Sequence, residues 1–201
     1  EYAQILIAYA RKEDRRTDVI AMSNFIRRTI QQRDFKANDM TLHMGGYPVK
    51  TGTILLAYYA DRMGDLAYIK DYGEIRKCIN EAKRCYENDS VLLENGSPEW
   101  LPRFWINMMH CLNIIGRFDR TIELGETLTL KMTNEEYYLY LAEAYYMKNN
   151  LEEACKNARR SAGLEKSQGN LLLLAQICFT ERKYTETKKL LWQCISMISD
   201  R

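Results

Sequence analysis

The spacing of the predicted turns constrains this chain more than any other feature. Short polar segments around Gly116, Asn149 and Arg182 each separate two amphipathic helical patterns, and they follow one another every 33 residues. A hairpin of two amphipathic helices cannot bury its own apolar face, so hairpins repeated at a fixed spacing must stack on one another. The spacing therefore predicts an all-α chain of stacked antiparallel helical hairpins.

The first half of the chain is less regular. Turns are expected at Glu13 and at Met63-Gly64-Asp65, so that the spacing between Glu13, Gly64 and Gly116 rises to 51 and 52 residues. Gly45-Gly46 and Pro48 predict a loop over 36–50. The helices expected in this half, by their apolar periodicity, cover 1–12, 19–34, 51–63 and 66–87, with a second long connection over 87–100.

These differences predict the domain organisation. Residues 1–97 are expected to hold divergent hairpins with long loops between them, and residues 98–201 three regular hairpins in the same continuous solenoid. Helix start signals support the regular half, because Ser97-Pro98 combines an N-cap residue with a proline at the first helical position. Thr133 is expected to cap the next helix, and Asn150, three residues before Glu153, the one after it.

The segment from about residue 100 to 199 resembles tetratricopeptide repeats. The best-matching unit is 135–166, and the residues that carry the match are Tyr138, Leu141, Ala142, Tyr145, Leu151, Ala154 and Ala162. The unit before it departs from the pattern with Thr121, and the unit after it with Thr187, where a small alanine is expected. The resemblance implies a right-handed α-solenoid of about five stacked hairpins, whose first helices line a concave face that binds ligands.

The resemblance also implies which side chains face that groove. They combine aromatic and methionine anchors with a few polar groups, a mixture that suits a peptide or an amphipathic helix. The implied binding residues are Arg103, Ile106, His110, Asn113 and Ile114 in the first regular unit, Glu136, Leu139, Glu143, Tyr146 and Met147 in the second, and Gln176, Phe179 and Thr180 in the third.

Charge and hydropathy argue against nucleic-acid binding through bulk charge and against insertion into a membrane. The formal net charge is +2, which is too balanced to predict nucleic-acid binding from bulk charge. The longest apolar runs, 54–60 and 171–175, are far shorter than the ~20 residues of a transmembrane helix, so no membrane insertion is expected. The start of the chain lacks a basic leader and a cleavage site, so no signal peptide is expected. The cysteine usage predicts a reduced, cytoplasmic protein.

No catalytic, metal or cofactor site is expected. The six cysteines form no CxxC pair and fall mostly at apolar helix positions, where a free cysteine behaves as a small buried hydrophobe. His110 and Cys111 are adjacent and therefore point to different sides of a helix, which argues against a Cys-His dyad. The paired acids Glu135-Glu136 and Glu152-Glu153 open helices, where carboxylates favour the positive end of the helix dipole.

The sequence predicts a non-catalytic scaffold that binds a peptide or a partner domain on the concave face. Two alternatives stay open: an accessory repeat region of a larger enzyme or secretion component, and an RNA-binding repeat protein that uses the basic segments 11–36, 156–166 and 182–189. An apolar stripe in the last helix further predicts that the C-terminal hairpin pairs with a second copy. Its residues are Leu191, Trp192, Ile195 and Ile198. The sequence does not identify the partner.

Overall fold

The computed structural model describes most of the chain in three long stretches, 47–94, 100–128 and 133–199, preceded by residues 12, 13, 15, 17–19, 21, 24, 25, 28 and 41–44. The chain divides into two compact units, residues 1–115 and residues 116–201. The predicted helices over 1–12 and 19–34, apart from these few positions, and the predicted cap at Ser97 lie outside the described residues. The predicted division at residue 97 and the single continuous solenoid stay predictions.

A short β-hairpin replaces part of the loop that the sequence predicts over 36–50. Strand β1 (Thr41–Met44) pairs antiparallel with β2 (Tyr47–Lys50), in a register that sets Thr41 opposite Lys50 and Met44 opposite Tyr47. The two strands are separated in the sequence by Gly45-Gly46, a dipeptide that two-residue hairpin loops favour. The prediction of a loop was therefore wrong for 41–44 and 47–50. All other regular elements in the described residues are α-helices.

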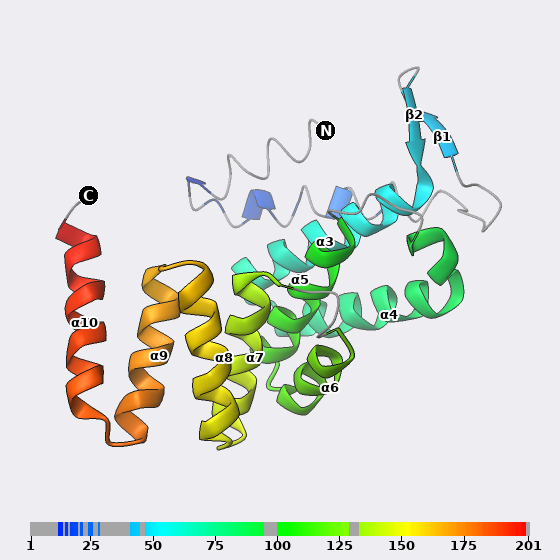
Figure 1. Ribbon diagram of the computed structural model, residues 1–201. Helices are drawn as coiled ribbons and strands as arrows, with labels where there is room; N and C mark the ends of the chain where they lie inside the picture. The colour runs from blue at the N-terminus through cyan, green and yellow to red at the C-terminus, as the bar shows by residue number, and fades with distance from the viewer. Residues whose placement is uncertain are drawn as a thin grey trace. The chain divides into compact units, whose positions relative to one another are not determined.

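Unit 1 contains helices α3 (Thr51–Ile69), α4 (Tyr72–Glu94) and α5 (Trp100–Ile114), and α3 packs against both of the others (Figure 1). The predicted turn at Met63-Gly64-Asp65 was wrong, because α3 continues through it and turns only at Lys70, with a left-handed φ of 56°. A glycine inside a helix costs only about 1 kcal/mol. The burial of Met63 and Leu66 outweighs that cost.

Two polar contacts fix α5 on α3. Asn107 Nδ2 donates a 2.8 Å hydrogen bond to the backbone carbonyl of Ala60, and the thiol of Cys111 donates to the carbonyl of Met63 at 3.3 Å. A third contact joins α3 to α4, where the guanidinium of the buried Arg62 lies 3.1 Å from the carboxylate of Glu74. Helix α4 also runs on to Glu94, which makes the second connection shorter than the sequence predicts.

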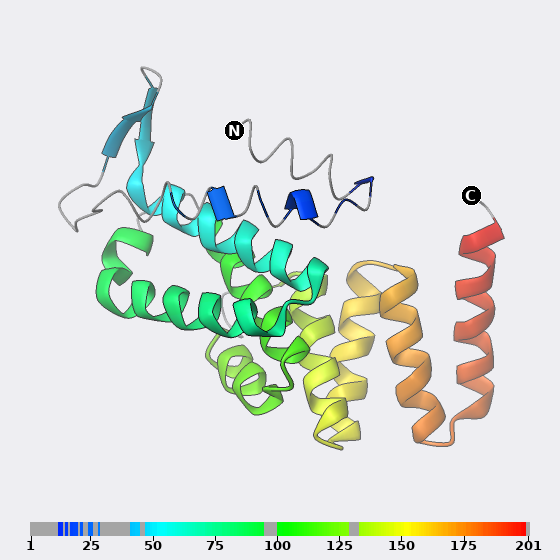
Figure 2. The same ribbon diagram turned by 180° about the vertical axis from the view of Figure 1, so that it is seen from behind.

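The described residues of unit 2 form five helices: α6 (Phe118–Leu128), α7 (Glu135–Met147), α8 (Leu151–Leu164), α9 (Gln168–Thr180) and α10 (Tyr184–Ser199). Helices α7 to α10 lie side by side in a row, each antiparallel to the next (Figures 1 and 2). The predicted helical pairs over 135–166 and 168–199 are confirmed as α7 with α8 and α9 with α10. No helix in the part of the chain that the structure describes is long and apolar enough to cross a membrane.

The 33-residue repeat is visible in the backbone. Gly116, Asn149 and Arg182 all adopt a left-handed conformation, with φ of 72°, 59° and 60°. The last two each follow a helix whose cap residue donates its N–H to carbonyls of the preceding turn. A left-handed residue at this point lets the chain reverse, as it does between α7 and α8 and between α9 and α10.

The helix starts of unit 2 are capped by short polar side chains. Asn134, not Thr133 as the sequence predicts, caps α7 by accepting a 3.0 Å hydrogen bond from the N–H of Tyr137. Asn150 caps α8 by accepting from the N–H of Glu153 at 3.3 Å, as predicted. Ser167 caps α9 in the same way, with Asn170 as the donor at 3.2 Å.

Small residues allow the helices of unit 2 to pack closely. The core of its last two pairs is built largely from alanine, cysteine and leucine: Ala142, Ala154, Cys155, Ala158, Ala162, Leu171, Leu174, Ala175, Ile177, Cys178, Leu190 and Cys194. Between α6 and α7 the close approach occurs at Gly125, where an added Cβ would lie 2.7 Å from a methyl carbon of Leu141. Helix α6 can approach α7 this closely because residue 125 has no side chain.

Candidate functional site

A hydrogen-bonded cluster joins α7 to α9, the first helices of two successive pairs. The hydroxyl of Tyr146 lies 3.2 Å from Oγ1 of Thr180, and Gln176 Nε2 donates to the same Tyr146 hydroxyl at 3.3 Å. Because Thr180 Oγ1 donates its own proton to the carbonyl of Gln176, Tyr146 is the donor in its contact with Thr180. We call Tyr146, Gln176 and Thr180 the α7–α9 cluster; all three belong to the predicted groove.

The cluster holds its polar atoms at the surface. Gln176 and Thr180 are exposed and Tyr146 is half-buried, with its ring against the core of α8 and α9. Each hydroxyl both donates and accepts, which fixes the two helices relative to each other. The geometry thus provides a pre-ordered polar patch on the side of unit 2 where a groove was predicted.

The other predicted residues of α7 surround Tyr146 on the same helix. Met147 is 56% exposed and follows it directly, Glu136 is exposed in the first turn, and Leu139 and Glu143 are half-buried. Glu136, Leu139, Glu143 and Tyr146 follow one another at intervals of three or four residues, which places them on one side of a helix. Leu139 and Glu143 therefore lie within two turns of Tyr146, and Glu136 lies within three.

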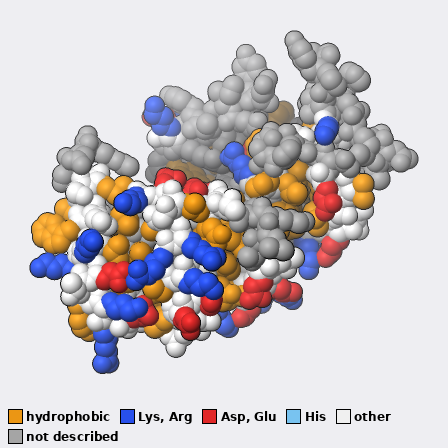
Figure 3. All heavy atoms as spheres, viewed as in Figure 1, with side chains coloured by type: hydrophobic (Ala, Val, Ile, Leu, Met, Phe, Trp, Pro, Cys, Tyr) orange, Lys and Arg blue, Asp and Glu red, His pale blue; other side chains and the backbone are white. Residues whose placement is uncertain are grey.

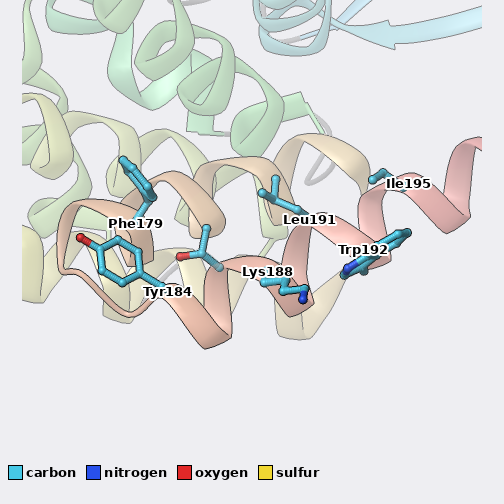
Figure 4. A pocket seen from close by; sticks show the side chains of 7 residues that line it. Phe179, Tyr184, Lys188, Leu191, Trp192 and Ile195 are labelled. Carbon is cyan, nitrogen blue, oxygen red and sulfur yellow. The ribbon is translucent and has the colours of Figure 1, made fainter.

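Phe179 takes part in a different feature. Its ring is 60% exposed and contacts the ring of Tyr184 edge to face, with centroids 5.7 Å apart. Both rings line a shallow hollow of about 390 Å³ along α10, which Figure 4 shows from close by. The remaining lining residues are Thr187, Lys188, Leu191, Trp192 and Ile195. The sequence indicated the apolar stripe of α10 but not that Phe179 lies beside it.

The predicted residues of α5 belong to unit 1 and fall into two groups. Ile106 and Asn113 are only 4% and 5% exposed, so they offer almost no surface to a ligand. Arg103 is exposed, forms a 3.2 Å ion pair with Asp61, and places its guanidinium over the ring of Trp100. A groove shared by α5, α7 and α9 stays a prediction.

His110 lies seven residues after Arg103 and so on the same side of α5. It is partly buried, and burial, which disfavours the charged imidazolium, lowers the pKa of His110 from its ordinary value. The imidazole is therefore neutral at pH 7, and Arg103 carries the positive charge on this side of α5.

The thiols of Cys111 and Cys178 are poor nucleophiles. All six cysteines are free, and five of them are buried. Burial raises the pKa of Cys178 to about 11 and also raises that of Cys111, which keeps both protonated at neutral pH. Within the described ranges no three side chains of the His, Cys, Asp or Glu type come together as metal ligands.

Comparison with known proteins agrees with the helical-repeat fold. The family model for subunit 3 of the anaphase-promoting complex, cyclosome, matches residues 116–194, which is nearly all of unit 2. The chain has a tetratricopeptide-like helical-repeat fold. A search of the curated proteins finds no match to the sequence.

Solved structures share the tetratricopeptide-like fold at very low sequence identity. MamA from Desulfovibrio magneticus RS-1, residues 41 to the end, superposes with a TM-score of 0.63 at 10% identity, over 99% of this chain and 96% of that one. The MamA RS-1 ArsTM double mutant gives a TM-score of 0.62 at 11% identity, over 98% and 95%. At this identity the likeness is one of fold alone, and it confirms the predicted all-α repeat architecture.

Proposed function

We propose that this protein is an interaction scaffold that binds an extended peptide segment of a partner on the α7 and α9 side of unit 2. A tetratricopeptide-like fold suggests a protein-interaction scaffold. The observation that supports the site is the α7–α9 cluster, because it fixes an exposed amide and two hydroxyl groups across successive repeats. Such groups recognise a peptide backbone, which presents donors and acceptors at regular intervals.

The chemistry of the partner follows from what surrounds the cluster. Gln176 Nε2 is held by Tyr146, which directs the amide oxygen of Gln176 away from that contact, where it can accept a backbone N–H. Met147 supplies a flexible apolar surface beside it, a type of side chain suited to varied hydrophobic partners. A segment with an apolar anchor therefore fits best beside the cluster.

The ion pairs of unit 2 argue against the RNA-binding alternative. Lys156 pairs with Glu153, Arg159 with Glu186 and Lys183 with Glu181, at 2.9, 2.7 and 2.9 Å. These are among the bases of 156–166 and 182–189 that a phosphate backbone would need. Figure 3 likewise shows Lys and Arg side chains interspersed with Asp and Glu over this unit. Opposite charges this close weaken the field that attracts a polyanion.

Selection from a peptide library with the whole chain, followed by calorimetry of the selected peptides, tests the proposal. Gln176→Ala and Tyr146→Phe remove one hydrogen-bonding group each, and we expect either to weaken binding by about tenfold, equivalent to ~1.4 kcal/mol. Tyr138→Phe, on a ring that stacks with Arg160 instead, is the matched control and should bind as the parent does.

Two outcomes would overturn this assignment. One is peptide binding that both cluster substitutions leave unchanged, since the site would then lie elsewhere. The other is tight binding of homopolymeric RNA that falls steeply as salt is added, which would indicate a nucleic-acid interface.

A further inference from the structure

Helix α10 exposes a continuous row of large side chains. Leu191, Trp192, Ile195 and Ile198 are 41–61% exposed, although they are the kind of residue that folding normally buries. Tyr184 and Lys188 extend the row toward the start of the helix, and Figure 4 shows most of the row along one side of α10. We call these six residues the α10 stripe.

The preceding repeat shows what covers the equivalent side of its own second helix, α8. Moving back 33 residues, the α10 stripe corresponds on α8 to Cys155, Ala158, Arg159 and Ala162 among others. Cys155, Ala158 and Ala162 are buried in the same core cluster as residues of α9, and Arg159 reaches Glu186 on α10. In the preceding pair, therefore, the equivalent side of the second helix is covered by another helix.

The side chains of the α10 stripe are too large for another helix to pack on α10 as closely as α9 packs on α8. Leu191 and Ile195 stand where α8 has Ala158 and Ala162, so a helix cannot approach α10 as closely as α9 approaches α8. Five residues of the stripe, Tyr184, Lys188, Leu191, Ile195 and Ile198, are instead separated by four, three, four and three residues. That alternation is the heptad spacing of a two-helix coiled-coil seam.

The heptad positions of α10 are self-complementary in the antiparallel direction. When two copies of α10 are set antiparallel with Leu191 opposite Ile195, Lys188 of each copy lies opposite Ile198 of the other. Lys188 then sits at the C-terminal turn of its partner, the negative end of the helix dipole. In the described part of α10 that last turn has no basic residue of its own. A parallel pair would set Lys188 against Lys188, where the like charges repel.

We propose that the protein forms a two-fold symmetric dimer in which α10 pairs antiparallel with α10 of a second copy. The interface is isologous: Leu191 and Ile195 form its centre, Trp192 covers its flank, and Lys188 closes each end. This surface uses residues of α10 only and so leaves the α7–α9 cluster free for a peptide. It explains why six large or charged residues are aligned on a helix that already buries another side through Leu190 and Cys194.

Sedimentation velocity of the whole chain tests the dimer. We expect the parent to be dimeric and both Leu191→Glu and Ile195→Glu to be monomeric, with unchanged helicity by circular dichroism because both side chains are exposed in the monomer. Leu172→Glu is the matched control: Leu172 is similarly exposed, at 43%, but lies on α9 outside the stripe, so this variant should stay dimeric. Lys188→Glu should weaken the dimer at least tenfold.

Cross-linking tests the direction of pairing. Under mild oxidation a mixture of Leu191→Cys and Ile195→Cys chains should form a disulfide between positions 191 and 195, identified by mass spectrometry. Preferential 191–191 and 195–195 links would indicate a parallel pair and overturn the proposal.

A chain that stays monomeric at its highest soluble concentration would also overturn the proposal. So would a monomer in which Trp192 is shielded from quenchers, since another helix would then cover α10. Gln176→Ala separates this proposal from the peptide site, because it should remain dimeric whatever its effect on peptide binding.

Discussion

The hydroxyl of Tyr137 donates a 2.7 Å hydrogen bond to the backbone carbonyl of Gly125, and both groups are buried. Residue 125 lies in the last turn of α6, whose final carbonyls have no partner within their own helix. The contact therefore ties α7 to the end of α6 at the point where Gly125 allows the two helices to approach. It brings a side-chain donor from α7 to a carbonyl near the end of α6.

Replacing Tyr137 by Phe should show how much this hydrogen bond contributes to the free energy of unfolding. The substitution keeps the ring in the core and removes a buried hydrogen bond to the Gly125 carbonyl, so the free energy of unfolding should fall by about 1–3 kcal/mol. Urea titration of the variant measures the change. Tyr138→Phe, on the neighbouring and partly exposed ring, serves as control and should stay within about 0.5 kcal/mol of the parent. Equal stability of both variants would contradict the role given to the hydroxyl.

Two glycines with equally open surroundings should respond in opposite directions to alanine. A Cβ added at Gly116 or at Gly163 meets nothing within 4 Å, so packing does not enter the comparison. Gly116 has a φ of 72°, where an L-residue is strained, and Gly116→Ala should lower stability by about 1 kcal/mol. Gly163 lies within α8, and Gly163→Ala should raise stability by about 0.5–1 kcal/mol. Thermal unfolding of the two variants checks the sign, and a loss in both would be inconsistent with a purely backbone effect.

Sequence reasoning succeeded where a local signal repeats. The turns at Gly116, Asn149 and Arg182 and the paired helices of unit 2 were predictable, because polar turn residues punctuate an apolar period of constant length. The cap at α7 was misplaced by one residue, since Thr133 and Asn134 are both good caps and only the backbone decides between them. The turn predicted at Gly64 failed for a non-local reason: packing of α3 on α5 continues the helix through a residue that disfavours it.

The predicted site depended even more on tertiary contacts. The repeat geometry placed Tyr146, Gln176 and Thr180 on one side of unit 2, and the structure joins them through hydrogen bonds. The repeat geometry could not show that Ile106 and Asn113 are buried, because periodicity gives the side of a helix but not what covers that side. The repeat geometry also could not show that Phe179 lies apart from the α7–α9 cluster. That depends on the contact between its ring and the ring of Tyr184 at the start of α10.

Thr121 and Thr187 stand where the repeat favours a small alanine, and both are buried. The hydroxyl of Thr187 donates to the carbonyl of Lys183 at 3.0 Å, whereas no hydrogen bond to Oγ1 of Thr121 exists among the described residues. Thr121→Val keeps the volume and removes an unsatisfied polar atom, so we expect stability to rise by about 1 kcal/mol. Thr187→Val removes a satisfied hydrogen bond and should lower it by about 0.5–1.5 kcal/mol. Chemical unfolding of the pair tests this, and the same sign for both would refute it.

The stability of the protein should fall as the solution is acidified below the ordinary pKa of histidine. Burial lowers the pKa of His110 in the folded state, so below pH ~6.5 the unfolded chain binds a proton that the folded chain does not. The contribution of His110 is therefore fully present above that pH and is lost as the pH falls through it. Melting temperatures of the parent and of His110→Gln, measured across this range, should converge at low pH. His43→Gln, at the other histidine of the chain, is the control, and an identical pH profile for the parent and His110→Gln would show that His110 does not contribute.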